Sequence, residues 1–316
     1  MNSSRSRKIF LTFDVEDFIN ERSVKALHTI LLLLEKHRLG ALFFITDRMA
    51  EKLALHKEVM VLLHDHQIGY HSSSHSVRPT IPEYTDVEDY QQAKAESMRR
   101  ESSRIDPLTG EVLGEGGIRT LRDVFGGRVL EAHRAPDYCW SPAHLEALRD
   151  MGFQYDFSSK IADDPVDFRG ITFYPFPIWH NWTGNYLFRD FWLSLLSRKT
   201  VVVNFHDWHF VDAKPWNYFY VNGNPMDYCK VGARRPWETR RMFIAFEMFL
   251  RNLRLIQSGG FARITPRLER SQINLAAGSV DVGEVYSAVA RLYKDIYDYQ
   301  PAYLCQHFER FFADSS

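Results

Sequence analysis

Short apolar runs alternate with amphipathic segments along almost the whole chain, and this alternation restricts the fold more than any other feature of the sequence. Seven runs read as buried strands, at residues 8–13, 41–46, 66–71, 127–133, 153–157, 200–205 and 261–265. Seven segments have helical periodicity, at residues 21–38, 50–64, 84–104, 142–151, 185–197, 237–257 and 280–297. Strands that alternate with helices predict a parallel sheet with helices outside it.

The length of the chain turns this pattern into a specific fold prediction. With 316 residues, 45% of them hydrophobic, the chain can bury a large core. We predict an α/β fold, a single, irregular, seven-stranded (β/α) barrel over residues 1–265. An aromatic-rich insertion without clear periodicity occupies about 207–236, and residues 266–316 are predicted to form a C-terminal helical extension packed on the barrel.

Charge and cysteine content argue against several classes of protein. The net charge is −1 and no long basic run is present, so neither nucleic acid nor an anionic membrane is an expected partner. Three cysteines lie far apart in the sequence, which disfavours a disulfide framework. No window is apolar enough for a transmembrane span, and the first residues do not resemble a signal peptide, so we expect a soluble, cytoplasmic protein.

Four predicted strands each end in a residue that can handle a proton, a charge or a metal. Asp14 follows the first strand, His71 closes the third, Arg134 follows the fourth and His206 follows the sixth. In a parallel barrel the carboxyl ends of all strands meet on one rim, which is where active sites are built. We therefore expect these four side chains to share one site.

Two motifs at these strand ends have the donor atoms of a metal site. HSSSH places His71 and His75 four residues apart, which would put both imidazoles on one face of a helical turn. FDVED adds the carboxylates of Asp14, Glu16 and Asp17. Two imidazoles with one carboxylate suit zinc. Either motif alone is a weak signal, since histidines at this spacing are common and the acids could simply cap the next helix.

These motifs resemble those of the polysaccharide deacetylases, a carbohydrate esterase family that includes chitin, chitooligosaccharide and peptidoglycan deacetylases. The resemblance runs in order from about Lys8 to His206. It rests on LTFD with the acids after it, on ALFFIT, on HQIGYHSSSH, on RAPDY at 134–138 and on NFHD at 204–207. Four motifs in order at strand ends are far more specific than any one of them.

The resemblance implies a role for each matching residue. His71 and His75 would bind one divalent metal, most readily Zn²⁺. Asp14 would be the base that activates water, and Arg134 would orient it. The Tyr138 backbone N–H would help to hold the oxyanion.

On the other side of the scissile amide, the resemblance places a proton donor. His206 would protonate the departing amine, and we expect Asp156 to orient His206.

The first motif departs from the family pattern. The family usually has two adjacent aspartates there, the second a metal ligand, whereas Val15 occupies that second place. Alternation along an extended strand sends Asp14 and Glu16 to the same face, which favours Glu16 as the ligand. Asp17 is the competitor if the strand ends after Phe13.

The function that follows is hydrolysis of an acetamide on an acetylated sugar or sugar precursor, in cell-surface polysaccharide or lipopolysaccharide biosynthesis. Two alternatives stay open: hydrolysis of a non-sugar C–N bond, as in allantoinase-like relatives, and a carbohydrate-binding pseudoenzyme. Aromatic residues of the insertion, such as Trp208 and Trp216, and the IWHNW segment at 178–182 could line a sugar cleft or merely extend the core.

Overall fold

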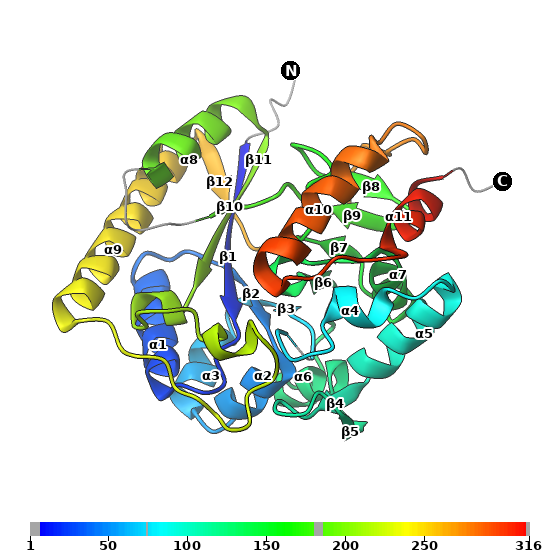
Figure 1. The fold of residues 1–316 in the computed structure, drawn as a ribbon. Coiled ribbons are helices and arrows are strands. Elements are labelled where there is room, and N and C mark those ends of the chain that lie inside the picture. The colour runs from blue at the N-terminus through cyan, green and yellow to red at the C-terminus, as the bar shows by residue number, and fades with distance from the viewer. Residues whose placement is uncertain (1–6, 74, 180–185, 314–316) are drawn as a thin grey trace, which may run out of the picture.

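The computed structural model describes residues 7–73, 75–179 and 186–313, and its centre is a curved, ten-stranded sheet (Figure 1). The strands follow the order β10-β11-β1-β2-β3-β6-β7-β9-β8, and β12 pairs with the first residues of β1. All pairings in this sheet are parallel except that of β8 with β9. The strands of the sheet are β1 (Arg7–Val15), β2 (Leu42–Ile45), β3 (Gln67–Tyr70), β6 (Ala132–His133), β7 (Tyr155–Asp156), β8 (Val166–Phe168), β9 (Ile171–Phe173), β10 (Ile178–Trp179), β11 (Thr200–His206) and β12 (Ala262–Ile264).

Helices surround this sheet on its outer side (Figure 1). They are α1 (Glu21–Lys36), α2 (Asp47–Leu53), α3 (Lys57–Leu63), α4 (Ile81–Thr85), α5 (Tyr90–Glu101), α6 (Ile118–Val124), α7 (Pro142–Asp150), α8 (Tyr186–Ser197), α9 (Pro236–Ser258), α10 (Val282–Tyr297) and α11 (Leu304–Phe312). In the part of the chain that the structure describes, no helix combines the length and the apolar character that crossing a membrane requires.

Alternation along the strands separates two apolar layers. On β1, Ile9, Leu11 and Phe13 join the core under the helices, whereas Phe10 faces the barrel interior. Interior side chains from six strands and their ends pack together there: Phe10, Leu42, Phe44, Ala132, Tyr155, Phe157, Tyr174 and Val202. A Cβ on Gly69 would lie 2.6 Å from the Phe44 ring, so only glycine lets this interior close. Polar residues that follow the interior positions therefore point into the mouth of the barrel.

The predicted fold class is confirmed, with more strands than the seven expected. β8, β9 and β10 are two or three residues long and therefore carry no periodic signal. Among the described residues no pairing joins β8 to β10, so the barrel is incomplete.

The structure differs from the predicted helices and strands at two places. The segment at 50–64 forms two helices, α2 and α3, and the Thr46 side chain caps the first of them at an earlier start. The glycine-rich stretch at 110–117 lies outside the predicted strands, yet it contains β5 (Val112–Glu115), which pairs with β4 (Ser103–Ile105). Asp106 accepts N–H bonds from Leu108 and Thr109 and so makes the hairpin turn.

Helices α10 and α11 close the side of the barrel at β8 and β9 (Figure 1). Tyr293, Phe308 and Phe312 are buried against Trp140 and Phe168 in one apolar cluster. The Tyr293 hydroxyl donates to the carbonyl oxygen of Trp140. This cluster joins the C-terminal helices to the strand ends that carry the polar residues.

Replacing Phe308 with Ala should destabilise the protein by about 3–5 kcal/mol, because it empties a fully buried aromatic position 4.7 Å from the Trp140 ring. Chemical denaturation measures the free energy of unfolding. Met226→Ala, at a side chain that is 94% exposed, is the control and should be neutral. If Phe308→Ala changed the free energy of unfolding as little as Met226→Ala does, the C-terminal helices would not share the barrel's cooperative core.

Candidate active site

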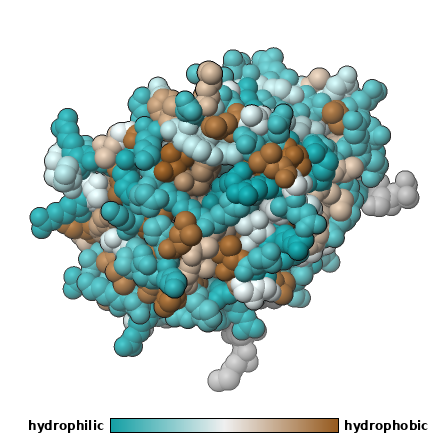
Figure 2. Space-filling model, turned by 90° about the horizontal axis from the view of Figure 1, so that it is seen from below, coloured by the Kyte–Doolittle hydropathy of each residue, from teal (hydrophilic) through white to brown (hydrophobic). Residues whose placement is uncertain are grey.

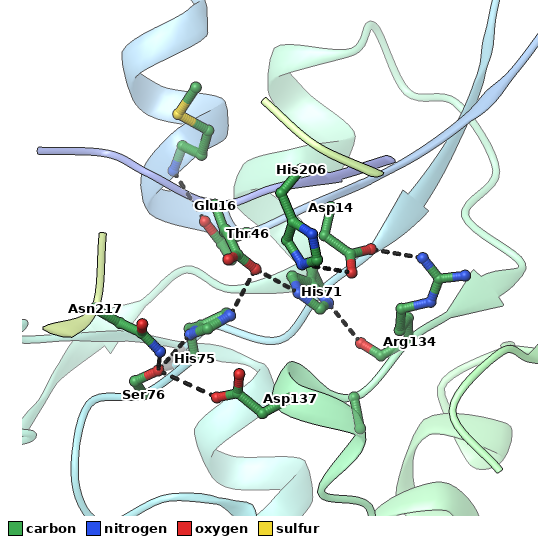
Figure 3. Close-up of polar contacts among 12 residues, drawn as sticks. Asp14, Glu16, Thr46, His71, His75, Ser76, Arg134, Asp137, His206 and Asn217 are labelled. Carbon is green, nitrogen blue, oxygen red and sulfur yellow. Dashed lines mark hydrogen bonds and ion pairs between the residues drawn. The ribbon is translucent and has the colours of Figure 1, made fainter. Parts of the chain in front are cut away.

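Parallel pairing brings the polar strand ends together at one end of the barrel. Asp14 on β1 is the register partner of His206 on β11, and the His206 Nε2 lies 3.4 Å from an Asp14 carboxylate oxygen. His71 follows β3, and Arg134 follows β6. Figure 3 shows all four around one centre. The four side chains predicted to share a site therefore do so.

Glu16, His71 and His75 form the group best suited to a metal. One Glu16 carboxylate oxygen, Oε2, lies 2.9 Å from the His71 Nε2 and 2.7 Å from the His75 Nε2, and all three side chains are buried (Figure 3). The His71 Nδ1 lies 2.9 Å from the Arg134 carbonyl oxygen, which makes Nδ1 the donor and leaves Nε2 free to bind a cation. Two imidazoles and a carboxylate that converge in this way fit a divalent metal.

The segment that carries the two histidines differs from the expected helical turn. Ser72 and His75 have positive φ angles of 66° and 44°, and the segment is irregular. The two imidazoles nevertheless converge, with ring centroids 5.1 Å apart.

The second Glu16 oxygen is fixed by the insertion. Oε1 accepts indole N–H bonds from Trp208 at 2.9 Å and Trp216 at 2.8 Å. Burial alone would raise the pKa of Glu16, but His75 and His71 outweigh it and hold the pKa well below its ordinary value. Glu16 is thus an ionised carboxylate whose Oε2 faces the histidines.

Asp17 lies apart from this group. Its carboxylate accepts bonds from the backbone N–H groups of Ile19 and Asn20, from the Asn20 amide and from the Ser23 hydroxyl. Asp17 therefore caps the start of α1, which is the alternative role considered for the acids of FDVED. The geometry therefore favours Glu16 over Asp17 as a ligand.

Arg134 holds Asp14 in place. The guanidinium NH1 donates to an Asp14 oxygen at 2.7 Å, and both side chains are almost fully buried. Burial would raise the pKa of Asp14, but Arg134 together with His71 and His206 outweighs it and lowers the pKa below its ordinary value. Asp14 is therefore ionised when its partners are charged, as a base must be.

Two predicted contacts are not present. Asp156, expected to orient His206, lies on the outer face of β7, 3.3 Å from the His133 Nδ1, and also accepts bonds from Ser158 and Ser159. The prediction failed because Tyr155 and Phe157 take the interior positions of this strand, so alternation turns Asp156 outwards.

The second absent contact concerns Tyr138. Its backbone N–H, expected to face an oxyanion, donates to the Ala135 carbonyl oxygen at 3.0 Å in a short 3₁₀ turn.

A cavity of about 480 Å³ opens directly over these groups. Its floor includes Asp14, Glu16 and His206, and its walls come from elsewhere in the chain. The insertion supplies Asn217 and Val221 among other wall residues, and α10 supplies Asp295 and Ile296. Figure 2 looks onto this end of the molecule and shows hydrophobic groups spread through the middle of the face, with hydrophilic residues along most of its edge.

Comparison with known protein families identifies part of the chain. Residues 2–155 match the family model described as polysaccharide deacetylase. This stretch belongs to the polysaccharide deacetylase family. It includes Asp14, Glu16, His71, His75 and Arg134, whereas His206 lies beyond it. No curated protein sequence matches the chain.

Solved structures of polysaccharide deacetylases and related esterases align only distantly. A family 4 carbohydrate esterase from Bacillus anthracis is 15% identical, with 83% of this chain and 82% of that chain covered and a TM-score of 0.38. The catalytic domain of a peptidoglycan N-acetylglucosamine deacetylase from Eubacterium rectale is 14% identical, with 87% and 94% covered and a TM-score of 0.42. A family 4 pseudoenzyme from Bacillus anthracis is 12% identical, with 64% and 55% covered and a TM-score of 0.36.

Asn204 is a site residue that the sequence analysis missed. It lies outside the polysaccharide deacetylase stretch, two residues before His206 on β11, and so faces the same interior. Its amide nitrogen donates to Asp14 at 2.7 Å and to the Tyr138 hydroxyl at 2.8 Å, and its oxygen accepts from Arg134 at 2.6 Å. Alternation backwards from His206 was the signal that could have found it.

Glu101, at the end of α5, was also missed, and it supports the histidine loop of the polysaccharide deacetylase stretch. Its fully buried carboxylate accepts bonds from the Ser72 hydroxyl at 2.8 Å and the Ser73 backbone N–H at 3.1 Å. The His144 Nε2 lies 3.0 Å from the same carboxylate, and the Tyr70 hydroxyl also donates to it. Burial would raise the pKa of Glu101, but these partners, His144 foremost, lower it to about 2.

Glu101→Gln should lower the free energy of unfolding by about 3–5 kcal/mol, the usual cost of removing one partner from a buried charged network. The amide presents a donor to groups that are themselves donors. Glu96→Gln, on the same helix, is the matched control: it removes only a partly exposed pair with Arg99 and should stay within about 0.5 kcal/mol of the parent. Equal denaturation midpoints for the two variants would contradict this account of the loop.

Proposed function

We propose that the protein is a metal-dependent N-deacetylase that removes the acetyl group from an acetylated sugar. The observation that supports this most strongly is the convergence of Glu16, His71 and His75 beside the paired Asp14 and His206 at the floor of one cavity. Membership of residues 2–155 in the polysaccharide deacetylase family supports the same reaction class.

Glu16, His71 and His75 would hold the metal, and zinc is the metal that their donor atoms prefer. Bound there, a divalent cation would supply a Lewis acid for the acetamide carbonyl. The departure at Val15 is compatible with this assignment, because Val15 faces the outer core and Glu16 takes the interior position that follows Asp14.

The chain's own residues provide the proton transfers. Asp14, held by Arg134 and Asn204, would accept a proton from the water that attacks the carbonyl carbon. When the C–N bond breaks, His206 would donate a proton to the amine nitrogen, which is otherwise a very poor leaving group. The products are acetate and a free amino sugar.

The two groups are neighbours in the structure, whereas the sequence analysis expected them on opposite sides of the scissile amide. The His206 Nε2 lies 3.4 Å from Asp14, across the β1–β11 pairing. We infer that the proton which Asp14 accepts can pass to His206 and from there to the amine. His206 is also 29% exposed at its side chain, so it can reach a substrate in the cavity.

The metal assignment is tested by matched carboxylate-to-amide variants. Glu16→Gln should weaken zinc binding by more than the 10–100-fold that loss of an outer partner costs, because it removes a ligand. Asp17→Asn should leave zinc affinity near that of the parent, since Asp17 only caps α1. Zinc titration of the purified proteins measures both. A weaker affinity in Asp17→Asn alone, or full zinc content in a His71→Ala/His75→Ala variant, would refute the assignment.

The acid assignment is tested by His206→Ala. We expect turnover of an N-acetylated sugar oligomer to fall by roughly a factor of 10²–10⁴, the usual contribution of a positioned proton donor. Zinc content should not change, because His206 is outside the ligand group. His64→Ala, at an exposed histidine on the outside of the barrel, is the control. Near-native turnover, or loss of zinc, in His206→Ala would show that His206 has another role.

A further inference from the structure

In the part of the chain that the structure describes, no other helix or strand covers the outer face of α8 and α9, and the composition of this face is unusual for an exposed surface. The two helices lie side by side at one flank of the barrel, with the Phe191 and Phe249 rings 5.4 Å apart between them (Figure 1). The buried side of α9 includes Phe246, Phe249 and Leu253, which pack on the sheet. The opposite side of each helix faces solvent.

Six large apolar side chains stand on this outer face, and each is between 39% and 67% exposed. We call them, with the arginines described next, the α8–α9 face. The apolar members are Trp192, Leu193, Leu196, Ile244, Met248 and Leu255. Scattered exposed apolar residues are normal, but six on two adjacent helices form the kind of patch that marks an interaction site.

Arginines alternate with the apolar residues along α9. Arg241, Ile244, Met248, Arg251 and Leu255 follow one another at steps of three or four residues, which places them in one line along the helix.

Two more arginines, Arg240 and Arg254, flank this line. Among the described residues none of these four arginines has an ion-pair partner within 4.0 Å, although the same helix carries acids. Glu247 pairs with Lys36, and Glu238 accepts the Arg235 N–H at the helix start. The charge of this face is therefore clearly positive.

We propose that the α8–α9 face binds the surface of an anionic membrane, an interaction that goes beyond the deacetylase reaction and does not depend on it. A helix face that combines arginines with aromatic and aliphatic side chains suits the headgroup region, where apolar groups enter the acyl boundary and arginines meet lipid phosphates. Because the net charge of the whole chain is only −1, it does not reveal the positive charge concentrated on the α8–α9 face.

Two other occupants fit the face less well. A second copy of the chain would bring arginine stripes together, and like charges facing each other are destabilising. Nucleic acid would satisfy the arginines but would leave the aliphatic side chains, such as Leu196 and Leu255, without apolar partners. Of these three occupants, a lipid surface is the one that accommodates both kinds of side chain.

The position of α9 links this face to the candidate site. α9 precedes β12, which is parallel to β1, so the helix begins at the end of the barrel where β1 ends and the cavity opens. Trp237, at that end of α9, is 56% exposed. A protein docked through this face would therefore hold its cavity close to the lipid headgroups.

Vesicle sedimentation with the full chain tests the proposal. The protein should bind vesicles of equal parts phosphatidylglycerol and phosphatidylcholine, and bind vesicles of phosphatidylcholine alone much more weakly. Arg241→Glu/Arg251→Glu should lower the affinity for the anionic vesicles by at least about thirty-fold, because each arginine near such a surface contributes about 1 kcal/mol. Met248→Ser/Leu255→Ser should also weaken binding, since it removes the apolar contact.

Matched variants on other faces control for net charge and exposed apolar area. Lys57→Glu/Arg291→Glu makes the same change in charge, and Leu55→Ser/Val61→Ser removes side chains that are 82% and 71% exposed. Both controls should bind like the parent, and all variants should keep the parent's thermal midpoint. Sedimentation velocity without lipid checks for self-association.

Several outcomes would overturn the proposal. These are no binding to anionic vesicles, equal binding by face and control variants, or a lipid-free dimer that the face variants abolish. Turnover of a soluble acetylated sugar should be unaffected by the face variants, which keeps this test separate from the tests of Asp14 and His206.

Discussion

The whole arrangement depends on one buried guanidinium. Arg134 is fully buried inside the barrel, where an unpaired charge would be very costly, so its bonds must be satisfied by fixed neighbours. NH1 donates to Asp14 and Asn204, NH2 donates to Thr12, and the group lies 4.3 Å from the Phe44 ring centroid. The charge therefore connects β1, β2, β6 and β11. Any displacement of these strand ends breaks at least one of its bonds, which fixes Asp14 relative to His206.

Glu16 is the second constraint, and it explains how the altered first motif can still form a site. A carboxylate has two oxygens, and here each has two nitrogen neighbours: the imidazoles of His71 and His75 at Oε2, and the indole N–H donors of Trp208 and Trp216 at Oε1. The longer side chain of glutamate reaches the histidines from one position further along the strand than the family's usual aspartate. The tryptophans then restrict it to a single orientation. The insertion is thus part of the site through the indole N–H groups of its tryptophans, a role distinct from the sugar stacking or core packing that the sequence predicts for these rings.

The sequence predicted the parts of the site that alternation and strand ends control. Asp14, Glu16, His71 and His206 could be found because each follows a strong apolar run at an interior position. Asp156 was misplaced because β7 has only two residues, too few to reveal which face each side chain takes. The role of Glu101 and the bond from Trp216 to Glu16 could not be predicted, since both residues act across long separations in sequence and lie in segments without a motif. The histidine loop was mistaken for a helical turn because spacing alone does not reveal positive φ angles.

The candidate site and the cavity wall draw on different parts of the chain, and this bears on substrate specificity. The stretch that matches the polysaccharide deacetylases ends at residue 155 and contains the candidate metal ligands and base. His206 and most of the cavity wall come from later segments, including Asn217 and Val221 of the insertion and Asp295 of α10. The Trp140 cluster packs against α10, so the part of the wall that α10 supplies is anchored to the core beneath it. The candidate base and metal ligands therefore come from the first part of the sequence and most of the cavity wall from the second, but Asn204 and His206 of the second part lie directly against Asp14. Only the wall residues beyond these two can change without disturbing Arg134 and Asp14.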